Sequence, residues 1–89
     1  MFGKINYAKF ESLEQMPQEA ANAWYGVKGV VGASYTPLLY LGNQSVKGTN
    51  HFFIAEQTLM TNPPIQRVVK VVINSYRGEH EIVSVEEVL

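Results

Sequence analysis

The two histidines are the side chains best suited to chemistry in this chain. His51 precedes a pair of aromatic residues, and His80 follows Glu79 in a segment that we predict to be a turn. Two imidazoles and a carboxylate would form a plausible ligand set for a transition metal if the fold brought the two segments together. The alternative is that both histidines are ordinary surface residues. Because the spacing fixes no geometry, we predict no metal site and expect no cofactor.

The chain lacks the patterns that accompany enzymatic chemistry. It contains no phosphate-binding glycine loop, no HExxH segment and no Ser/His/Asp pattern. It also contains no cysteine, which excludes disulfides and thiolate zinc sites and fits a reducing compartment. We therefore expect a protein that is not an enzyme.

Length and charge narrow the range of partners. The 89 residues suit a single domain, 1–89, and 46% of them are hydrophobic. Seven basic and eight acidic residues give a net charge of -1, which provides no attraction for nucleic acid or an anionic membrane. No apolar run has the length of a signal peptide or a membrane span. We expect a cytoplasmic protein, with secretion after removal of a leader as the alternative.

One helix is expected near the start of the chain. Residues 1–15 form a lead-in that is compatible with either a short helix or a strand at 5–7. Pro17 then suits the first turn of a helix. We predict a helix over 16–30, with Trp24 packed in the core rather than against a ligand. Its apolar stripe consists of four residues at helical spacing: Ala20, Trp24, Val27 and Val31.

Four strands are expected after the helix, over 34–89. The segments rich in aromatic, β-branched and aliphatic residues lie near 34–44, 49–60, 68–73 and 82–89. Consecutive strands joined by tight turns pair antiparallel, and only the helix is available to cover one face of the sheet. The predicted fold class is α+β, with one N-terminal α-helix wrapped by a four-stranded antiparallel meander.

Individual strand residues give more specific predictions. Pro37 cannot donate a ladder hydrogen bond, so the first strand should lie at an edge or bulge there. Alternation places Val69, Val71 and Ile73 on one face of the third strand. By the same rule, one face of the last strand carries Val83, Val85 and Leu89.

Two positions compete for the first hairpin turn. Gly42-Asn43 would make a good two-residue loop, but it leaves a following strand of about seventeen residues, longer than is usual. A turn at 45–48 gives two strands of similar length. We favour the turn at 45–48, which makes Gly42 a bulge within the incoming strand.

The segment at this turn has a recognisable signature, Gln-x-Val-x-Gly, followed by Thr49, Asn50 and His51-Phe52. Its residues are Gln44, Ser45, Val46, Lys47 and Gly48. With one helix before four antiparallel strands, over about 17–89, the chain resembles the cystatin and stefin family of cysteine protease inhibitors.

The resemblance implies a function and a set of binding residues. Family members inhibit papain-like cysteine proteases reversibly and without a covalent bond, through a wedge made of an N-terminal segment and two hairpin loops. Carried over by position, the N-terminal glycine is Gly3 and the first loop runs from Gln44 to Gly48. The second loop consists of Tyr76, Arg77 and Gly78.

Two features depart from the family pattern. The second loop lacks the Pro-Trp pair of many members, and Ser45 and Lys47 stand where small or apolar residues are usual. A lysine at the wedge tip is costly to desolvate unless it meets an acid. The alternative function is therefore a non-inhibitory, cystatin-like interaction module or oligomer subunit, acting as a homodimer or through a domain swap.

Overall fold

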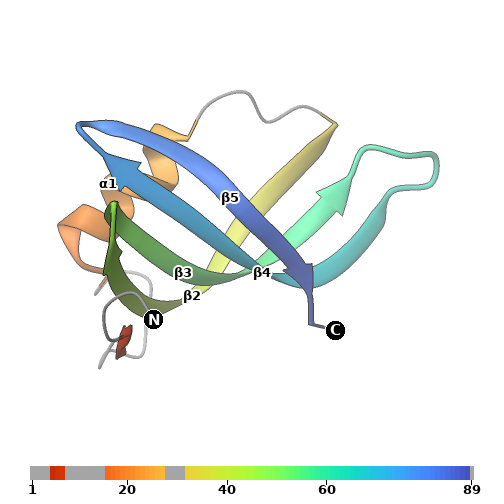
Figure 1. The fold of residues 1–89 in the computed structure, drawn as a ribbon. Coiled ribbons are helices and arrows are strands. Elements are labelled where there is room, and N and C mark those ends of the chain that lie inside the picture. The colour runs from red at the N-terminus through yellow and green to blue at the C-terminus, as the bar shows by residue number, and fades with distance from the viewer. Residues whose placement is uncertain (1–4, 8–15, 28–31, 89) are drawn as a thin grey trace.

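The computed structural model describes residues 5–7, 16–27 and 32–88. For residues 5–7 it describes the backbone only. Within these ranges the fold contains one helix, α1 (Gln18–Gly26), and five strands. The strands form a single antiparallel sheet in the order β1-β2-β3-β4-β5 (Figure 1). Their bounds are Ile5–Tyr7, Ala33–Val46, Gly48–Leu59, Ile65–Tyr76 and Glu79–Glu87.

The predicted α+β class and the four-stranded meander after the helix are confirmed by β2 to β5. The short strand β1 extends the sheet by pairing with β2, from Ile5 opposite Gln44 to Tyr7 opposite Gly42. The strand at 5–7 is therefore confirmed, whereas the alternative short helix falls on lead-in residues that lie outside the described ranges.

The helix is shorter than the predicted span of 16–30. Pro17 precedes its first turn, and its carbonyl oxygen accepts a 3.0 Å hydrogen bond from the backbone N–H of Ala21. The helix ends at Gly26, and Val27 is already extended at φ -67° and ψ 135°. Glycine followed by a β-branched residue is a poor continuation of a helix, which accounts for the early end. The predicted stripe residue Val31 lies outside the described residues.

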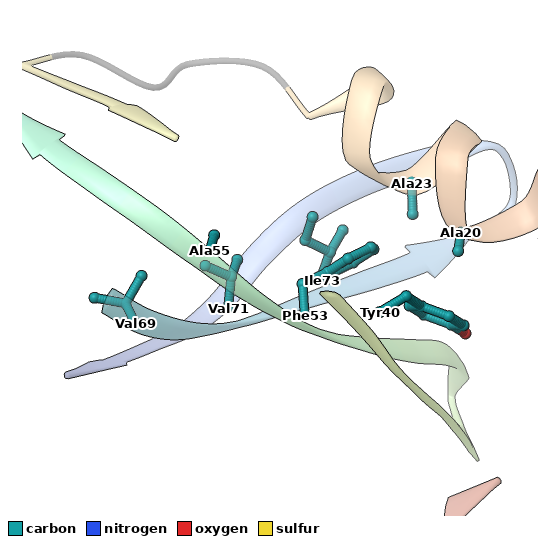
Figure 2. Close-up of a cluster of buried hydrophobic side chains, with 8 residues drawn as sticks. All are labelled: Ala20, Ala23, Tyr40, Phe53, Ala55, Val69, Val71 and Ile73. Carbon is teal, nitrogen blue, oxygen red and sulfur yellow. The ribbon is translucent and has the colours of Figure 1, made fainter. Parts of the chain in front are cut away.

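Helix α1 packs against one face of the sheet, close to β4 and β5 (Figure 1). Two small residues, Ala20 and Ala23, bring its backbone close to that face, and both are fully buried. Trp24 packs edge-on against Phe53 with ring centroids 4.9 Å apart, which confirms its predicted place in the core. The buried cluster in Figure 2 comprises Ala20, Ala23, Tyr40, Phe53, Ala55, Val69, Val71 and Ile73.

Two bulges in β2 curl the sheet around the helix. The pairing register with β3 shifts once between Pro37 and Leu39 and again between Tyr40 and Gly42. The first shift confirms the predicted bulge at the proline, which has no N–H to donate. The second confirms a bulge next to Gly42 instead of a turn, because Tyr40 pairs with Phe53 and Gly42 with Phe52, which leaves Leu41 as the extra residue. Bulges increase the local twist of a strand.

The last strand departs from strict alternation. Val69, Val71 and Ile73 of β4 are buried on one face, as predicted. Their partners on β5 show a register shift, because Ile73 pairs with Ile82 whereas Val72 pairs with Ser84. Val83 is thus the extra residue of a bulge and is 50% exposed. That Val83, Val85 and Leu89 share a face stays a prediction, since the bulge interrupts the alternation at Val83 and Leu89 lies outside the described residues.

Candidate functional site

The first hairpin turns within the predicted segment 45–48. Strand β2 ends at Val46 and β3 begins at Gly48, with only Lys47 between them. Gly48 has φ +83°, in the left-handed region that favours glycine. The Gln-x-Val-x-Gly signature therefore ends on a residue that the turn itself requires.

The second hairpin turns at the two residues Arg77 and Gly78. Both have positive φ, at 52° and 79°, and Tyr76 pairs with Glu79 across the turn. Two central residues with positive φ form the I′ turn that matches the twist of paired strands. This tight turn fixes the direction in which Tyr76 and Arg77 are presented.

The two hairpin turns lie side by side at one end of the sheet (Figure 1). Thr49 pairs with Ser75, and a Cβ at Gly48 would stand 3.0 Å from the Cβ of Tyr76. The side-chain amide of Asn74 donates a 3.1 Å hydrogen bond to the carbonyl oxygen of Lys47. We call this surface the composite tip, made of Ser45, Val46, Lys47, Gly48, Tyr76, Arg77 and Gly78.

One aromatic ring joins the two turns at the composite tip. The Nζ of Lys47 lies 5.5 Å from the centroid of the Tyr76 ring, and the guanidinium carbon of Arg77 lies 5.1 Å from it. Cations at this distance are attracted by the negative face of the ring. Tyr76, which is 36% exposed, therefore lies at the surface with two positive charges beside its ring.

Strand β1 enters the sheet from the same end. Ile5 pairs with Gln44 and Tyr7 with Gly42, so β1 runs away from the composite tip as the chain proceeds. Gln44, the first residue of the predicted loop, thus lies within the sheet beside β1. The predicted N-terminal residue Gly3 lies outside the described residues. The other predicted binding residues fall in the two adjacent hairpins.

The fold does bring the two histidines to one place. His51 and His80 line a cavity of about 330 Å³ between α1 and the sheet, together with Glu19, Asn22, Thr49 and Ser75. The acid that lines this cavity is Glu19, whereas Glu79 was the carboxylate considered from the sequence. Within the described parts of the chain, no three His, Cys, Asp or Glu side chains are grouped so that they could hold a metal ion.

His51 is a core residue, so its interpretation as a surface histidine is wrong. It is only 3% exposed, and its Nδ1 lies 3.0 Å from the Tyr40 hydroxyl in a hydrogen bond. Burial lowers the pKa of His51, while the charge of Glu19 acts in the opposite direction and His80 adds to the lowering. The two-residue alternation of His51 with buried Phe53 was the sequence signal for this burial.

His80 has a different environment on β5. Its Nδ1 lies 2.7 Å from the Ser75 hydroxyl, and its ring packs against the backbone of Gly26 at the end of α1. An added Cβ at Gly26 would overlap the imidazole. The His80 ring therefore packs between the last turn of the helix and the sheet and is not fully exposed to solvent.

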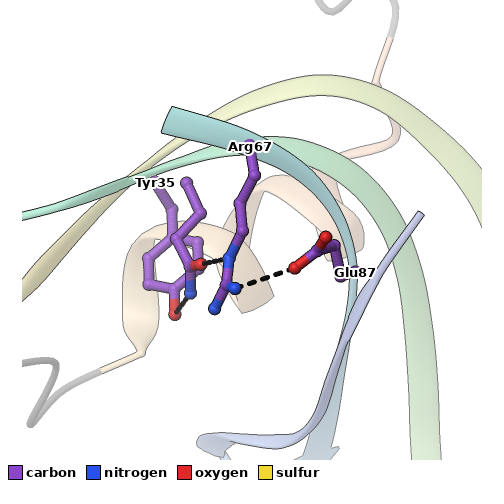
Figure 3. A network of polar contacts seen from close by, with 4 residues as sticks. Tyr35, Arg67 and Glu87 are labelled. Atoms are coloured by element: carbon purple, nitrogen blue, oxygen red, sulfur yellow. Dashed lines mark hydrogen bonds and ion pairs between the residues drawn. The ribbon is translucent and has the colours of Figure 1, made fainter. Parts of the chain in front are cut away.

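A polar network on the other half of the same face was not predicted (Figure 3). Gln57 is 5% exposed, donates a 2.8 Å hydrogen bond to the Tyr35 hydroxyl and accepts one from Arg67. Arg67 also pairs with Glu87 at 2.8 Å. The buried amide is therefore satisfied by partners on two strands, β2 and β4, and Arg67 links it to Glu87 on β5.

Comparison with protein-family models, with curated proteins and with solved structures finds no match for this chain. The assignment of a function therefore depends on the geometry of the chain itself. Within the described ranges, no helix has the length and apolar character needed to cross a membrane.

Proposed function

We propose that this protein is a reversible, non-covalent inhibitor of papain-like cysteine proteases, which inserts the composite tip into the protease cleft. The observation that carries the proposal is the direct packing of the two hairpin turns, with Gly48 of the first against Tyr76 of the second. A wedge requires two loops that enter the cleft together, and this contact joins the two turns into a single edge.

Preorganisation supports the proposal. The Asn74 amide holds the Lys47 carbonyl at 3.1 Å and also donates a 2.9 Å hydrogen bond to the Asn50 side chain. The second turn has only two residues, Arg77 and Gly78, between paired strands. An edge that is already ordered loses little conformational entropy when it docks, so more of the contact energy remains as affinity.

The direction of β1 agrees with a three-part wedge. The strand begins opposite Gln44 and runs away from the composite tip, so the chain enters the sheet from the tip side. In the inhibitor family that the sequence resembles, an N-terminal segment completes the wedge beside the two loops. We therefore propose that the chain ahead of Ile5 contributes to binding.

A single-site blocking experiment tests the location of the binding surface. The chain contains no cysteine, so Ser45→Cys creates one thiol at an exposed position of the composite tip. Coupling a maleimide-linked polyethylene glycol to this thiol should abolish inhibition of papain. The matched control is Met60→Cys with the same label, because Met60 is 62% exposed beyond the end of β3, away from the tip.

The two labelled proteins separate the possible results. Inhibition that is lost with the label at position 45 and kept with the label at position 60 supports the composite tip. Equal inhibition by both labelled proteins contradicts it. Circular dichroism of each labelled protein shows whether the sheet has survived the modification.

One observation favours assembly as a second candidate function. Among the described residues, β1 pairs with residues 42–44 of β2, and residues 33–39 of β2 pair with no second strand on that side. Leu38 and Leu39 on this edge are 47% and 38% exposed. Unpaired edges can add a strand from another chain. Light scattering tests this, since a monomer at high concentration contradicts a function as an oligomer subunit.

A further inference from the structure

The composite tip carries an unusual distribution of charge. Lys47 and Arg77 come from different hairpins, yet both lie within 5.5 Å of the centroid of the same Tyr76 ring. Both side chains belong to exposed residues. Two positive charges thus stand together at the leading edge of the proposed wedge, in a chain whose net charge is -1.

Other basic residues in the described part of the chain are paired with acids. Arg67 pairs with Glu87 at 2.8 Å and Lys70 pairs with Glu86 at 3.2 Å, both between β4 and β5. Within the described ranges, neither Lys47 nor Arg77 forms an ion pair, although Glu79 directly follows the second turn. The structure therefore pairs the sheet cations and leaves the tip cations free to meet acids on another molecule.

Docking of this edge would move both cations out of water. Transfer of a charge into an apolar cleft is costly unless an opposite charge or hydrogen-bond acceptors receive it. The Tyr76 ring recovers a small part of that cost through cation–π attraction. A cleft lined only by apolar groups would thus oppose insertion, whereas carboxylates at its rim would favour it.

We propose that the composite tip selects papain-like proteases with acidic residues lining the part of the cleft that receives the two hairpin loops. This inference rests on the proposed function and specifies its target class. Lys47 and Arg77 are specificity-determining residues that speed association and discriminate against proteases with a basic cleft. Electrostatic complementarity acts mainly in these two ways.

The test uses two papain-like proteases, one with acidic and one with basic residues lining the cleft. Inhibition constants and association rates are measured with the wild type, Lys47→Met, and Lys47→Met combined with Arg77→Asn. Asparagine is chosen at position 77 because it tolerates the left-handed backbone found there, at φ 52°. The matched control is Lys70→Met, which makes the same chemical change at an ion pair on the sheet.

The expected effects follow from the strength of exposed ion pairs. On the acidic protease, Lys47→Met should raise the inhibition constant about twofold to fivefold, and the double variant about fourfold to twentyfold. Lys70→Met should change it less than about twofold. Raising the salt from ~0.05 M to ~0.5 M should slow association of the wild type far more than that of the double variant.

Three outcomes overturn the inference in distinguishable ways. If the wild type inhibits both proteases equally, the selectivity is absent although the proposed function stands. If Lys47→Met and Lys70→Met have the same effect, net charge rather than the composite tip is responsible. If the wild type inhibits neither protease at any salt concentration, the proposed function fails and the inference fails with it.

Discussion

Gly48 packs so closely against Tyr76 that a Cβ added to the glycine would stand 3.0 Å from the tyrosine Cβ and would overlap the carbonyl oxygen of Ser75. This contact joins two hairpins that are distant in the sequence. It gives the glycine of the Gln-x-Val-x-Gly signature a structural role besides any role in binding. A charged substitution at Gly48 would consequently disturb the fold together with the proposed interface.

Gly48→Ala should destabilise the protein by about 2–4 kcal/mol. A left-handed backbone costs a residue with a Cβ about 1–2 kcal/mol, and the steric overlap with the second hairpin adds to that cost. The measurement is the free energy of unfolding from urea denaturation.

Gly78→Ala is the matched control for this prediction. Gly78 also has positive φ, at 79°, but an added Cβ there meets nothing within 4 Å. Gly78→Ala should therefore lower the free energy of unfolding only by the cost of the left-handed backbone, about 1–2 kcal/mol. Equal destabilisation by the two substitutions would show that the hairpins do not pack together as described.

The stability of the protein should fall as the pH drops below 6.5. Burial lowers the pKa of His51 from its ordinary value of 6.5, so the unfolded chain binds more protons than the folded one below that pH. The Asn43 amide donates to the Tyr40 hydroxyl at 3.2 Å, which lets that hydroxyl donate to an unprotonated His51 Nδ1. The contribution of His51 to stability is therefore fully present above pH 6.5 and is lost as the pH falls toward its lowered pKa in the folded state.

Urea denaturation at a series of pH values checks this prediction. The control is His51→Gln, which keeps a polar side chain near Tyr40 but cannot titrate. The variant should show a flatter dependence of stability on pH between neutral and mildly acidic conditions. A wild-type profile that coincides with that of the variant would show that His51 does not titrate differently on folding.

Arg67→Met should cost more stability than Lys70→Met. Each basic residue pairs with a glutamate of β5, but Arg67 also donates to the buried amide oxygen of Gln57. Its removal leaves that oxygen without its donor, at a cost of about 1–3 kcal/mol, whereas an exposed ion pair contributes about 0–1 kcal/mol. Thermal and urea unfolding measure both changes, and equal losses would argue against the network in Figure 3.

The sequence carried enough information for the element order and the first turn. Hydrophobic periodicity located α1 and the four strands of the meander, and strand-length balance placed the turn near Lys47 rather than at Gly42. Those features are local, or they follow from the usual length of a strand. Pro37 likewise predicted its own bulge, because the missing N–H acts wherever the residue lies in a strand.

The features that the sequence did not predict arise from tertiary packing. The bulge beside Val83 depends on how β5 fits against β4, and no residue in the segment marks it. The burial of Gln57 depends on partners ten and twenty-two residues away, Arg67 and Tyr35. His51 was misjudged because its alternation with Phe53 indicates a shared face, and that face is known to be the buried one only once the orientation of β3 is fixed.

The candidate site, too, could be predicted from the sequence only in part. The residues of the two turns could be listed from the signature and the turn chemistry, but their packing against each other could not. Nor could the approach of Lys47 and Arg77 to one ring, since these residues lie thirty positions apart in the chain.

The most direct test of the central claim is the steady-state turnover of papain in the presence of increasing amounts of the folded wild-type protein. The proposed function predicts competitive inhibition with an inhibition constant of about 1 μM or below, and full recovery of activity on dilution. Unchanged papain turnover at tens of micromolar of protein with an intact circular dichroism spectrum would contradict it.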